Sequence, residues 1–263
     1  MTSFKVFVIS DCSGREEGLI VELNSAKLSY QIQEAIFLQK IPDFWNSKLS
    51  YLVTRRKLSI NELGCASAHQ NIYGFMVGND VSFALVFEDD AIINNIDGLL
   101  KSIHLAISQK FAPGFILSFY SENAEIPRSN PNGLNIRKCY SPPSGAVCYL
   151  LDLDAARILL EANQSLIYPP DWPLTEEIDF YINVGKLVSH SGSSSYLDNG
   201  RNNNRISAAK RFVNLLDLFL LSRYFRIRRI HNIDFAKYMT LLYVPTFTRY
   251  MRKMSRISQR FHS

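Results

Sequence analysis

The sequence of 263 residues predicts an α/β domain with a mostly parallel central sheet, followed by a basic helical tail. Short apolar runs typical of buried strands alternate with longer segments of helical periodicity, which is the pattern of a sheet with crossover helices. The charge also changes sign along the chain. Residues 201–263 hold 14 of the 29 Lys and Arg but two of the 24 Asp and Glu, a net +12 against −7 for residues 1–200.

The composition is that of a globular protein, with 47% hydrophobic and 20% charged residues. A domain of roughly 200 residues buries about 70% of its unfolded surface and needs no disulfide. The four cysteines form no C-x-x-C pair, which argues against a structural zinc site of that type. The start of the sequence shows no signal peptide, so we expect free thiols in a reducing compartment. No run approaches the roughly 18 apolar residues of a membrane span.

The first half of the sequence contains the clearest element signals. Ser59 and Glu62 have the spacing of a capping box, which predicts a helix that begins at residue 60. The apolar runs FKVFVIS and FALVF are typical of buried strands. The predicted elements are a strand at 4–10, a helix from 16–23, a strand near 32–37, a helix over 60–77, a strand at 83–87 and a helix over 96–109.

The second half is more mixed. Asp152 or Asp154 is expected to cap a helix, and the prolines around Asp171 predict a stiff loop. The predicted elements are a strand at 114–120, a loop at 121–138, a strand at 146–151, helices at 154–162 and 175–185, and a strand at 186–189. Residues 192–204 are rich in Ser, Asn and Gly, which is typical of a boundary loop. We therefore predict one domain at 1–204 and the helical tail at 205–263.

Three consecutive carboxylates, Glu88, Asp89 and Asp90, directly follow the apolar strand at 83–87. Ligands of open α/β sheets bind beyond the carboxyl ends of strands. Adjacent carboxylates repel one another, and hard cations such as Mg²⁺ or Mn²⁺ prefer oxygen ligands. The triplet therefore favours a metal site that could neutralise a leaving diphosphate. A solvated acidic turn is the alternative, and the same triplet also occurs in phosphatases, nucleases and polymerases.

The wider context of the triplet resembles glycosyltransferase family 25, which includes lipopolysaccharide galactosyltransferases and collagen galactosyltransferases. The resemblance rests on segments that keep their order over residues 4–201. They are VIS at 8–10 with Arg15, LSINELGCASAH at 58–69, EDD at 88–90, SG at 144–145 with YLL at 149–151, PDW at 170–172 and SSYL at 194–197. The sequence departs from the family pattern at Ala68, where serine is usual, and lacks an Asp-Gly element near 35–45.

The resemblance implies a GT-A-like, single Rossmann-type domain that binds a nucleotide-sugar and transfers its sugar with inversion, using a UDP-sugar and Mn²⁺ or Mg²⁺. It implies that Asp90 is a direct metal ligand and that Glu88 or Asp89 contacts the donor ribose or a metal-bound water. Arg15, after the first strand, would then reach the uracil or the diphosphate. An ordinary surface arginine is the alternative.

Two more residues follow from the resemblance. An inverting reaction needs a base that deprotonates the acceptor hydroxyl, and we predict Asp171 for this role, with Trp172 able to stack on a sugar. The alternatives for the base are Glu176 and Glu177. His190, near the end of the domain, is a candidate second metal ligand. A single histidine such as His69 is more typical of a hydrogen-bonded core residue than of a metal ligand. Cys65 and Cys148 are expected to be buried and to pack as small hydrophobic residues.

The tail combines arginines with aromatic and leucine residues at helical spacing. This pattern is typical of a helix that binds an anionic membrane surface, although residues 212–221 could equally pack on the domain. The sequence contains no nucleic-acid reader motif, so we expect no nucleic-acid partner.

The predicted function is metal-dependent transfer of a hexose, such as galactose, from a UDP-sugar to a lipopolysaccharide or another lipid-linked or oligosaccharide acceptor. We expect the protein in the cytoplasm, peripheral to the inner membrane face. The alternatives are a Mg²⁺-dependent phosphohydrolase and a non-catalytic, membrane-associated protein with the same fold.

Overall fold

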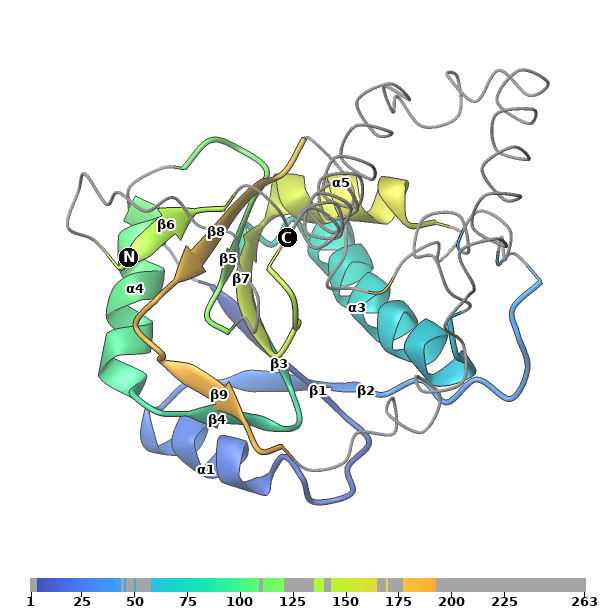
Figure 1. Cartoon of the computed structure of the whole chain (residues 1–263), viewed down its shortest axis with the longest axis horizontal. Coiled ribbons are helices and arrows are strands. Elements are labelled where there is room, and N and C mark those ends of the chain that lie inside the picture. Colours follow the sequence, from blue (N-terminus) through green and yellow to red (C-terminus); the bar gives the residue numbers. More distant parts are fainter. Residues whose placement is uncertain are drawn as a thin grey trace, which may run out of the picture. The chain divides into compact units, whose positions relative to one another are not determined.

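The computed structural model describes residues 4–43, 45, 50, 58–108, 111–120, 135–139, 143–164, 169 and 177–192. Within these ranges the main sheet is made of seven strands (Figure 1). Their bounds are β1 Lys5–Ser10, β2 Tyr30–Glu34, β3 Phe83–Glu88, β5 Phe115–Ser118, β6 Ile136–Lys138, β7 Cys148–Asp152 and β8 Asp179–Asn183.

The strands lie in the order β2-β1-β3-β7-β5-β8-β6. β1 is parallel to both β2 and β3, and β5 is parallel to β8. The other neighbouring pairs are antiparallel, because β7 and β6 run against the remaining strands. The sheet is therefore mixed, with most strands running in one direction. The predicted α/β class with a largely parallel sheet is confirmed.

Helices cover both faces of this sheet. In the part of the chain that the structure describes, the helices with defined bounds are α1 Glu17–Ser25, α3 Ile60–Gly78, α4 Ile96–Ser108 and α5 Leu153–Ala162. α1 and α4 pack on one face, and α3 and α5 pack on the other (Figure 1). Successive strand residues point to opposite faces, so Val6 and Val8 join the core under α1 and α4, whereas Phe7 and Ile9 join the core under α3 and α5.

Side-chain caps fix the starts of α3 and α5. Ser59 Oγ accepts a hydrogen bond from the Glu62 amide at 3.2 Å, and Glu62 Oε2 accepts one from the Ser59 amide at 2.8 Å. This capping box confirms the predicted start of the helix at residue 60. Asp152, and not Asp154, caps α5 by accepting from the Ala155 amide at 2.8 Å.

The predicted helix over 175–185 is wrong, because residues 179–183 form β8. Ile178, Phe180 and Ile182 are all buried, and this alternation is the period of a strand. Two other short strands were not predicted. β6 lies at the end of the segment predicted as a loop, and β4 (Ala91–Ile93) pairs with β9 (Val188–His190) in a separate antiparallel sheet.

The predicted boundary at 204/205 and the tail at 205–263 lie outside the described residues and stay predictions. None of the four cysteines forms a disulfide; Cys12 is exposed and Cys148 is buried. In the part of the chain that the structure describes, no helix is both long enough and apolar enough to span a membrane.

Candidate active site

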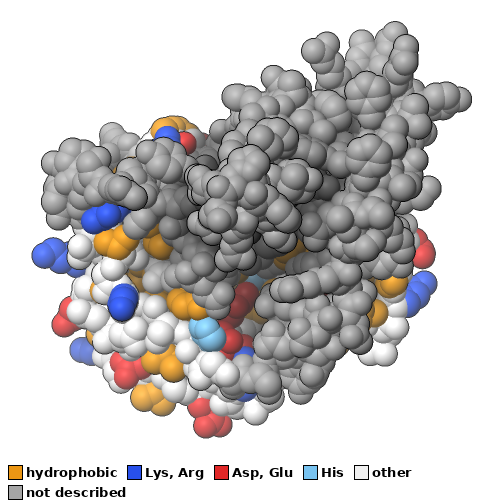
Figure 2. Space-filling view, viewed as in Figure 1, with side chains coloured by type: hydrophobic (Ala, Val, Ile, Leu, Met, Phe, Trp, Pro, Cys, Tyr) orange, Lys and Arg blue, Asp and Glu red, His pale blue; other side chains and the backbone are white. Residues whose placement is uncertain are grey.

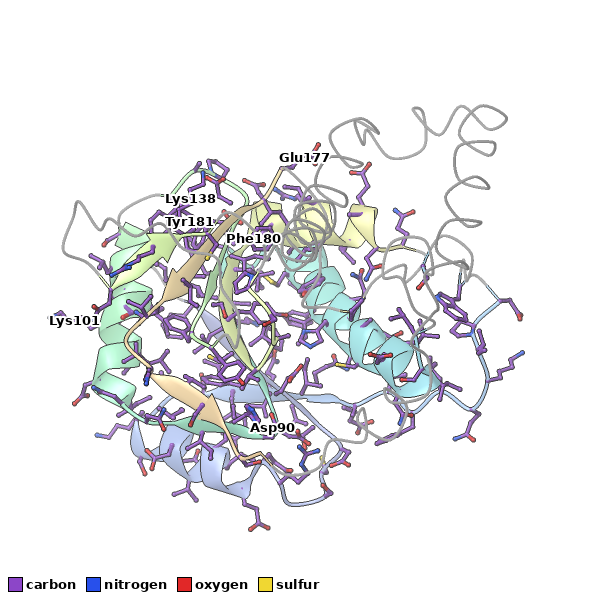
Figure 3. The ribbon with its side chains drawn as sticks, in the orientation of Figure 1. Asp90, Lys101, Lys138, Glu177, Phe180 and Tyr181 are labelled. Carbon is purple, nitrogen blue, oxygen red and sulfur yellow. The ribbon has the colours of Figure 1, made fainter. Side chains whose placement is uncertain are left out.

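The acidic triplet lies at the carboxyl edge of the main sheet. β1 and β3 are parallel neighbours, with Ile9 opposite Glu88, so the turn after β1 and the triplet after β3 meet at this edge. The next strand, β4, starts directly after Asp90 and pairs with β9. Figure 3 shows Asp90 beside this small sheet. The sheet edge thus brings together residues that are more than 70 positions apart in the sequence.

Arg15 lies against the two aspartates. Its Nη2 is 3.5 Å from Asp89 Oδ1 and 3.4 Å from Asp90 Oδ2. The turn that presents Arg15 has a left-handed Cys12 and is closed by a hydrogen bond from the Ser13 amide to Asp11 Oδ1 at 2.9 Å. Figure 2 shows acidic side chains gathered next to a histidine on this face. One guanidinium therefore faces two carboxylates, so the pair of aspartates is incompletely neutralised by Arg15.

Burial disfavours the ionised form of both aspartates. Burial, with a smaller contribution from the neighbouring Asp90, raises the pKa of Asp89 to about 6 against the opposing effect of Arg15. Burial also raises the pKa of Asp90, with Glu88 adding to the effect, while Arg15 and His190 lower it. Asp90 Oδ1 is buried and accepts no hydrogen bond from the described residues. A cation bound to these oxygens would relieve both the repulsion and the missing contact.

His190 is held next to Asp90 by the small sheet. It pairs with Ala91 in the β4–β9 ladder, and the Ser191 amide donates to the Asp90 carbonyl at 2.9 Å. The His190 ring stands edge-on to Tyr120, with ring centroids 5.3 Å apart. Gly145 makes this possible, because a β-carbon there would lie 2.8 Å from the Tyr120 ring. The rings of Tyr120 and His190 therefore lie at the border of the acidic edge.

Glu88 points the other way, towards α3. Its Oε1 is 3.5 Å from His69 Nε2 and 3.9 Å from Cys65 Sγ. The buried His69 ring is fixed from behind, because Nδ1 is 2.6 Å from the Tyr149 hydroxyl, which is 2.9 Å from the Tyr73 hydroxyl. The triplet therefore divides into Glu88 on the α3 side and two aspartates on the Arg15 side.

The sequence profile described as glycosyltransferase family 25 (LPS biosynthesis protein) matches residues 4–174, well over half of the chain. The chain belongs to glycosyltransferase family 25. No curated protein sequence matches it significantly. The matched range contains Arg15, His69 and the whole acidic triplet, whereas His190 lies beyond it.

Solved structures resemble this family 25 chain only distantly. A197 from STIV has 11% identity and a TM-score of 0.36, covering 60% of this chain and 67% of its own. A glycosyltransferase involved in the glycosylation of the major capsid of PBCV-1 has 9% identity and a TM-score of 0.38, covering 73% and 94%. Mannose-1-phosphate geranyltransferase from Thermus thermophilus has 7% identity and a TM-score of 0.35, covering 70% and 74%. Similarity this distant does not indicate a shared reaction.

Membership of family 25 decides that the protein is a glycosyltransferase, an enzyme with a nucleotide-sugar donor and a glycan acceptor. The phosphohydrolase and the non-catalytic alternatives are therefore not retained. Of the residues predicted for the site, the fold brings Arg15, Asp89, Asp90 and His190 together at one edge, with Glu88 beside them.

Other predicted residues fall elsewhere. Asp171, Trp172 and Glu176 lie outside the described residues. Glu177, an alternative for the base, precedes β8 and so lies at the amino edge of the sheet, opposite the triplet. Figure 3 shows it on the other side of the molecule from Asp90.

The aromatic and sulfur contacts of the site are not predicted from the sequence. Tyr149 is part of a segment that resembles the family but has no predicted role, and Tyr120 is not among the predicted site residues. His69 is buried as expected, but it contacts Glu88 as well as Tyr149. Cys65 is half-buried and lies near the same carboxylate. The spacing of Cys65 and His69, four residues apart on one helix, is a signal that could have found this pair.

Proposed function

We propose that this glycosyltransferase transfers a hexose, such as galactose, from a UDP-sugar to a lipopolysaccharide or other glycan acceptor, with inversion and in dependence on Mn²⁺ or Mg²⁺. The observation that carries the proposal is the incompletely neutralised pair Asp89 and Asp90 at the carboxyl edge of the sheet, with a buried Asp90 oxygen that lacks a hydrogen bond in the described structure. A GT-A-like domain is the fold that we propose to hold this site.

The residues present fit a hard divalent cation. Asp90 supplies the unsatisfied carboxylate oxygen, and His190 is close enough to influence the Asp90 carboxylate. We assign both as metal ligands, and Glu88 or Asp89 to the donor ribose or a metal-bound water. A bound cation supplies positive charge to the leaving diphosphate. We assign Arg15, which lies against both aspartates, to contact the diphosphate or the uracil.

In this proposal the acceptor hydroxyl oxygen bonds to the anomeric carbon while the bond from that carbon to the diphosphate oxygen breaks. Asp171 takes the hydroxyl proton, and Trp172 stacks on a sugar ring. Attack from the face opposite the leaving group gives inversion. The Tyr120–His190 pair at the border of the acidic edge offers an aromatic surface for a sugar.

We also propose that the basic tail, residues 205–263, binds the anionic inner face of a membrane and so holds the enzyme near a lipid-linked acceptor. The support is its charge of +12 over residues 201–263 together with its aromatic residues. The location we propose is therefore the cytoplasm, peripheral to the inner membrane face.

Thermal unfolding of the full chain tests the donor and the metal together. UDP, UDP-sugars and a GDP-sugar are each added with Mn²⁺ or with a chelator. At about a hundred times its dissociation constant, a ligand of the native state adds about 2.7 kcal/mol, which raises the melting temperature by about 5–10 °C for a protein of this size. We expect this rise with UDP-sugar plus Mn²⁺ and its loss in Asp90→Asn.

The matched control is Glu161→Gln, a change of similar chemistry at an exposed position near the end of α5. It should keep the full rise. An equal rise in Asp90→Asn, or a rise that does not depend on Mn²⁺, would overturn the metal-dependent mechanism. A rise with the GDP-sugar in place of the UDP-sugar would overturn the donor.

A further inference from the structure

Beside the acidic edge lies a second group of potential metal ligands. Cys65 and His69 are one turn apart on α3, and Glu88 is the last residue of β3. Among the described residues, these three each offer one ligand atom, Sγ, Nε2 and a carboxylate oxygen, and the atoms all lie within 4.8 Å of one another. Residues four apart on a helix project from the same face, so the helix presents the thiol and the imidazole together.

The imidazole of His69 is aimed into this group. Its side chain is 1% exposed, and Nε2 makes no hydrogen bond with the described residues. Glu88 Oε1 lies 3.5 Å from Nε2, which is too far for a good hydrogen bond. A buried ring nitrogen that faces a carboxylate and a thiol without a hydrogen bond is the arrangement that a cation would complete.

The hydroxyls behind the ring can pair with either tautomer of His69. His69 Nδ1 can donate to the Tyr149 hydroxyl, which then donates to the Tyr73 hydroxyl. In that arrangement the Nε2 lone pair points at Glu88 and Cys65. Histidines that bind metals commonly donate their other N–H to such a partner, which fixes the ring and its tautomer. In the reverse arrangement Tyr149 donates to Nδ1, and Nε2–H faces Glu88 at a long distance.

We propose that Cys65, His69 and Glu88 bind a borderline-soft divalent cation of the zinc class, separate from the hard cation assigned to the aspartates. Thiolate and imidazole ligands select zinc over magnesium or manganese. Tetrahedral zinc holds S, N and O ligand atoms about 3.4–3.6 Å apart. The observed 3.5 Å and 3.9 Å from Glu88 Oε1 are close to these values. Water or a substrate atom completes the fourth position.

Binding at this site has a definite proton balance. The Cys65 thiol releases its proton to solvent and binds as the thiolate, while the His69 nitrogen and the Glu88 carboxylate bind through existing lone pairs. The bound cation ties α3 to the end of β3 and fixes Glu88 beside the aspartates. The inference goes beyond the proposed sugar transfer and does not depend on it.

Cobalt titration of the full chain tests the site without any substrate. The protein is stripped with a chelator and titrated with Co²⁺, which replaces Zn²⁺ and gives a near-ultraviolet charge-transfer band when a thiolate is bound. We expect this band at one Co²⁺ per chain and its disappearance when Zn²⁺ is added. Cys65→Ser should lose the band, and Tyr149→Phe should weaken binding about 10- to 100-fold.

Two variants control for other sites. Cys12→Ser changes an exposed thiol outside the group, and Asp90→Asn changes the hard-cation site; both should keep the band. Absence of the band in the wild-type protein overturns the proposal, whatever the folding of the variants. A band that survives in Cys65→Ser also overturns it. The titration contains no nucleotide, so its result is independent of the donor test. The cobalt band can be absent although UDP-sugar binds with Mn²⁺, and the band can be present although UDP-sugar does not bind.

Discussion

Replacing Asp89 with Asn should stabilise the metal-free protein while damaging its function. Asp89 is largely buried, and its pKa rises from 3.8 to about 6. The folded protein therefore holds a proton on Asp89 more tightly than the unfolded chain does. Below about pH 4, Asp89 is protonated in both states and does not destabilise the fold. As the pH rises from about 4 through about 6, ionisation of Asp89 lowers the free energy of unfolding. Asn carries no charge, so the variant does not lose this stability.

The size of the effect follows from the two pKa values. Each pKa unit corresponds to about 1.4 kcal/mol, so Asp89→Asn should add about 3 kcal/mol at pH 8 as an upper limit. At pH 5 the gain should be about half as large, because Asp89 in the unfolded chain is then mostly ionised and in the native state mostly protonated. Arg15 keeps a partner in the variant, since it also lies 3.4 Å from Asp90.

Urea unfolding in the presence of a chelator, at pH 5 and pH 8, measures this difference. Asp11→Asn is the control of opposite sign. A hydrogen bond from the Ser13 side chain is the main cause of a lowered pKa at Asp11, so its removal should cost stability at neutral pH. An Asp89→Asn protein that is no more stable than wild type at pH 8, or whose gain is the same at both pH values, would refute the argument.

Two further predictions concern α3 and are checked by the same urea unfolding. Ser59→Ala should cost about 1 kcal/mol, because it removes the side-chain cap, whereas Ser59→Gly should cost only a few tenths. Gly64→Ala should destabilise the protein strongly, because a β-carbon at this position would lie 2.0 Å from the Ile36 carbonyl oxygen. Gly74→Ala, with open space in the same helix, should instead be neutral or stabilise by up to about 1 kcal/mol. Equal effects of the two glycine substitutions would contradict the close approach at Gly64.

The elements that the sequence predicts well have strong local signals. The helix at 60–78 is predicted to within a residue, because the Ser59–Glu62 capping box marks its start and Asn79 follows its end. β1 and β3 are predicted from mainly apolar runs, since strands covered by helices on both faces carry few polar residues. From those two strands alone, Arg15 and the acidic triplet can be expected near one sheet edge.

The elements that the prediction misses depend on tertiary pairing. β4 has three residues and is defined by its pairing with β9 across almost a hundred positions, whereas β9 itself overlaps the strand predicted at 186–189. β8 is predicted as a helix, although Ile178, Phe180 and Ile182 alternate, because a short segment with polar neighbours fits both periods. His190 next to Asp90 follows from the β4–β9 pairing, which no local pattern announces. Its candidacy rests on the family resemblance.

The division of the triplet, by contrast, can be derived from the period of the strand. Ala84 and Val86 point into the core under α3 and α5, whereas Leu85 and Phe87 point into the core under α1 and α4. Glu88 continues the even positions and therefore faces α3, where Cys65 and His69 lie. Asp89 and Asp90 come after the strand has ended, so their side chains are free of this alternation and both reach Arg15. A three-residue acidic motif at the end of a strand thus faces two environments. The proposed hard-cation and zinc-class ligand sets lie next to one another because of that single change in backbone geometry.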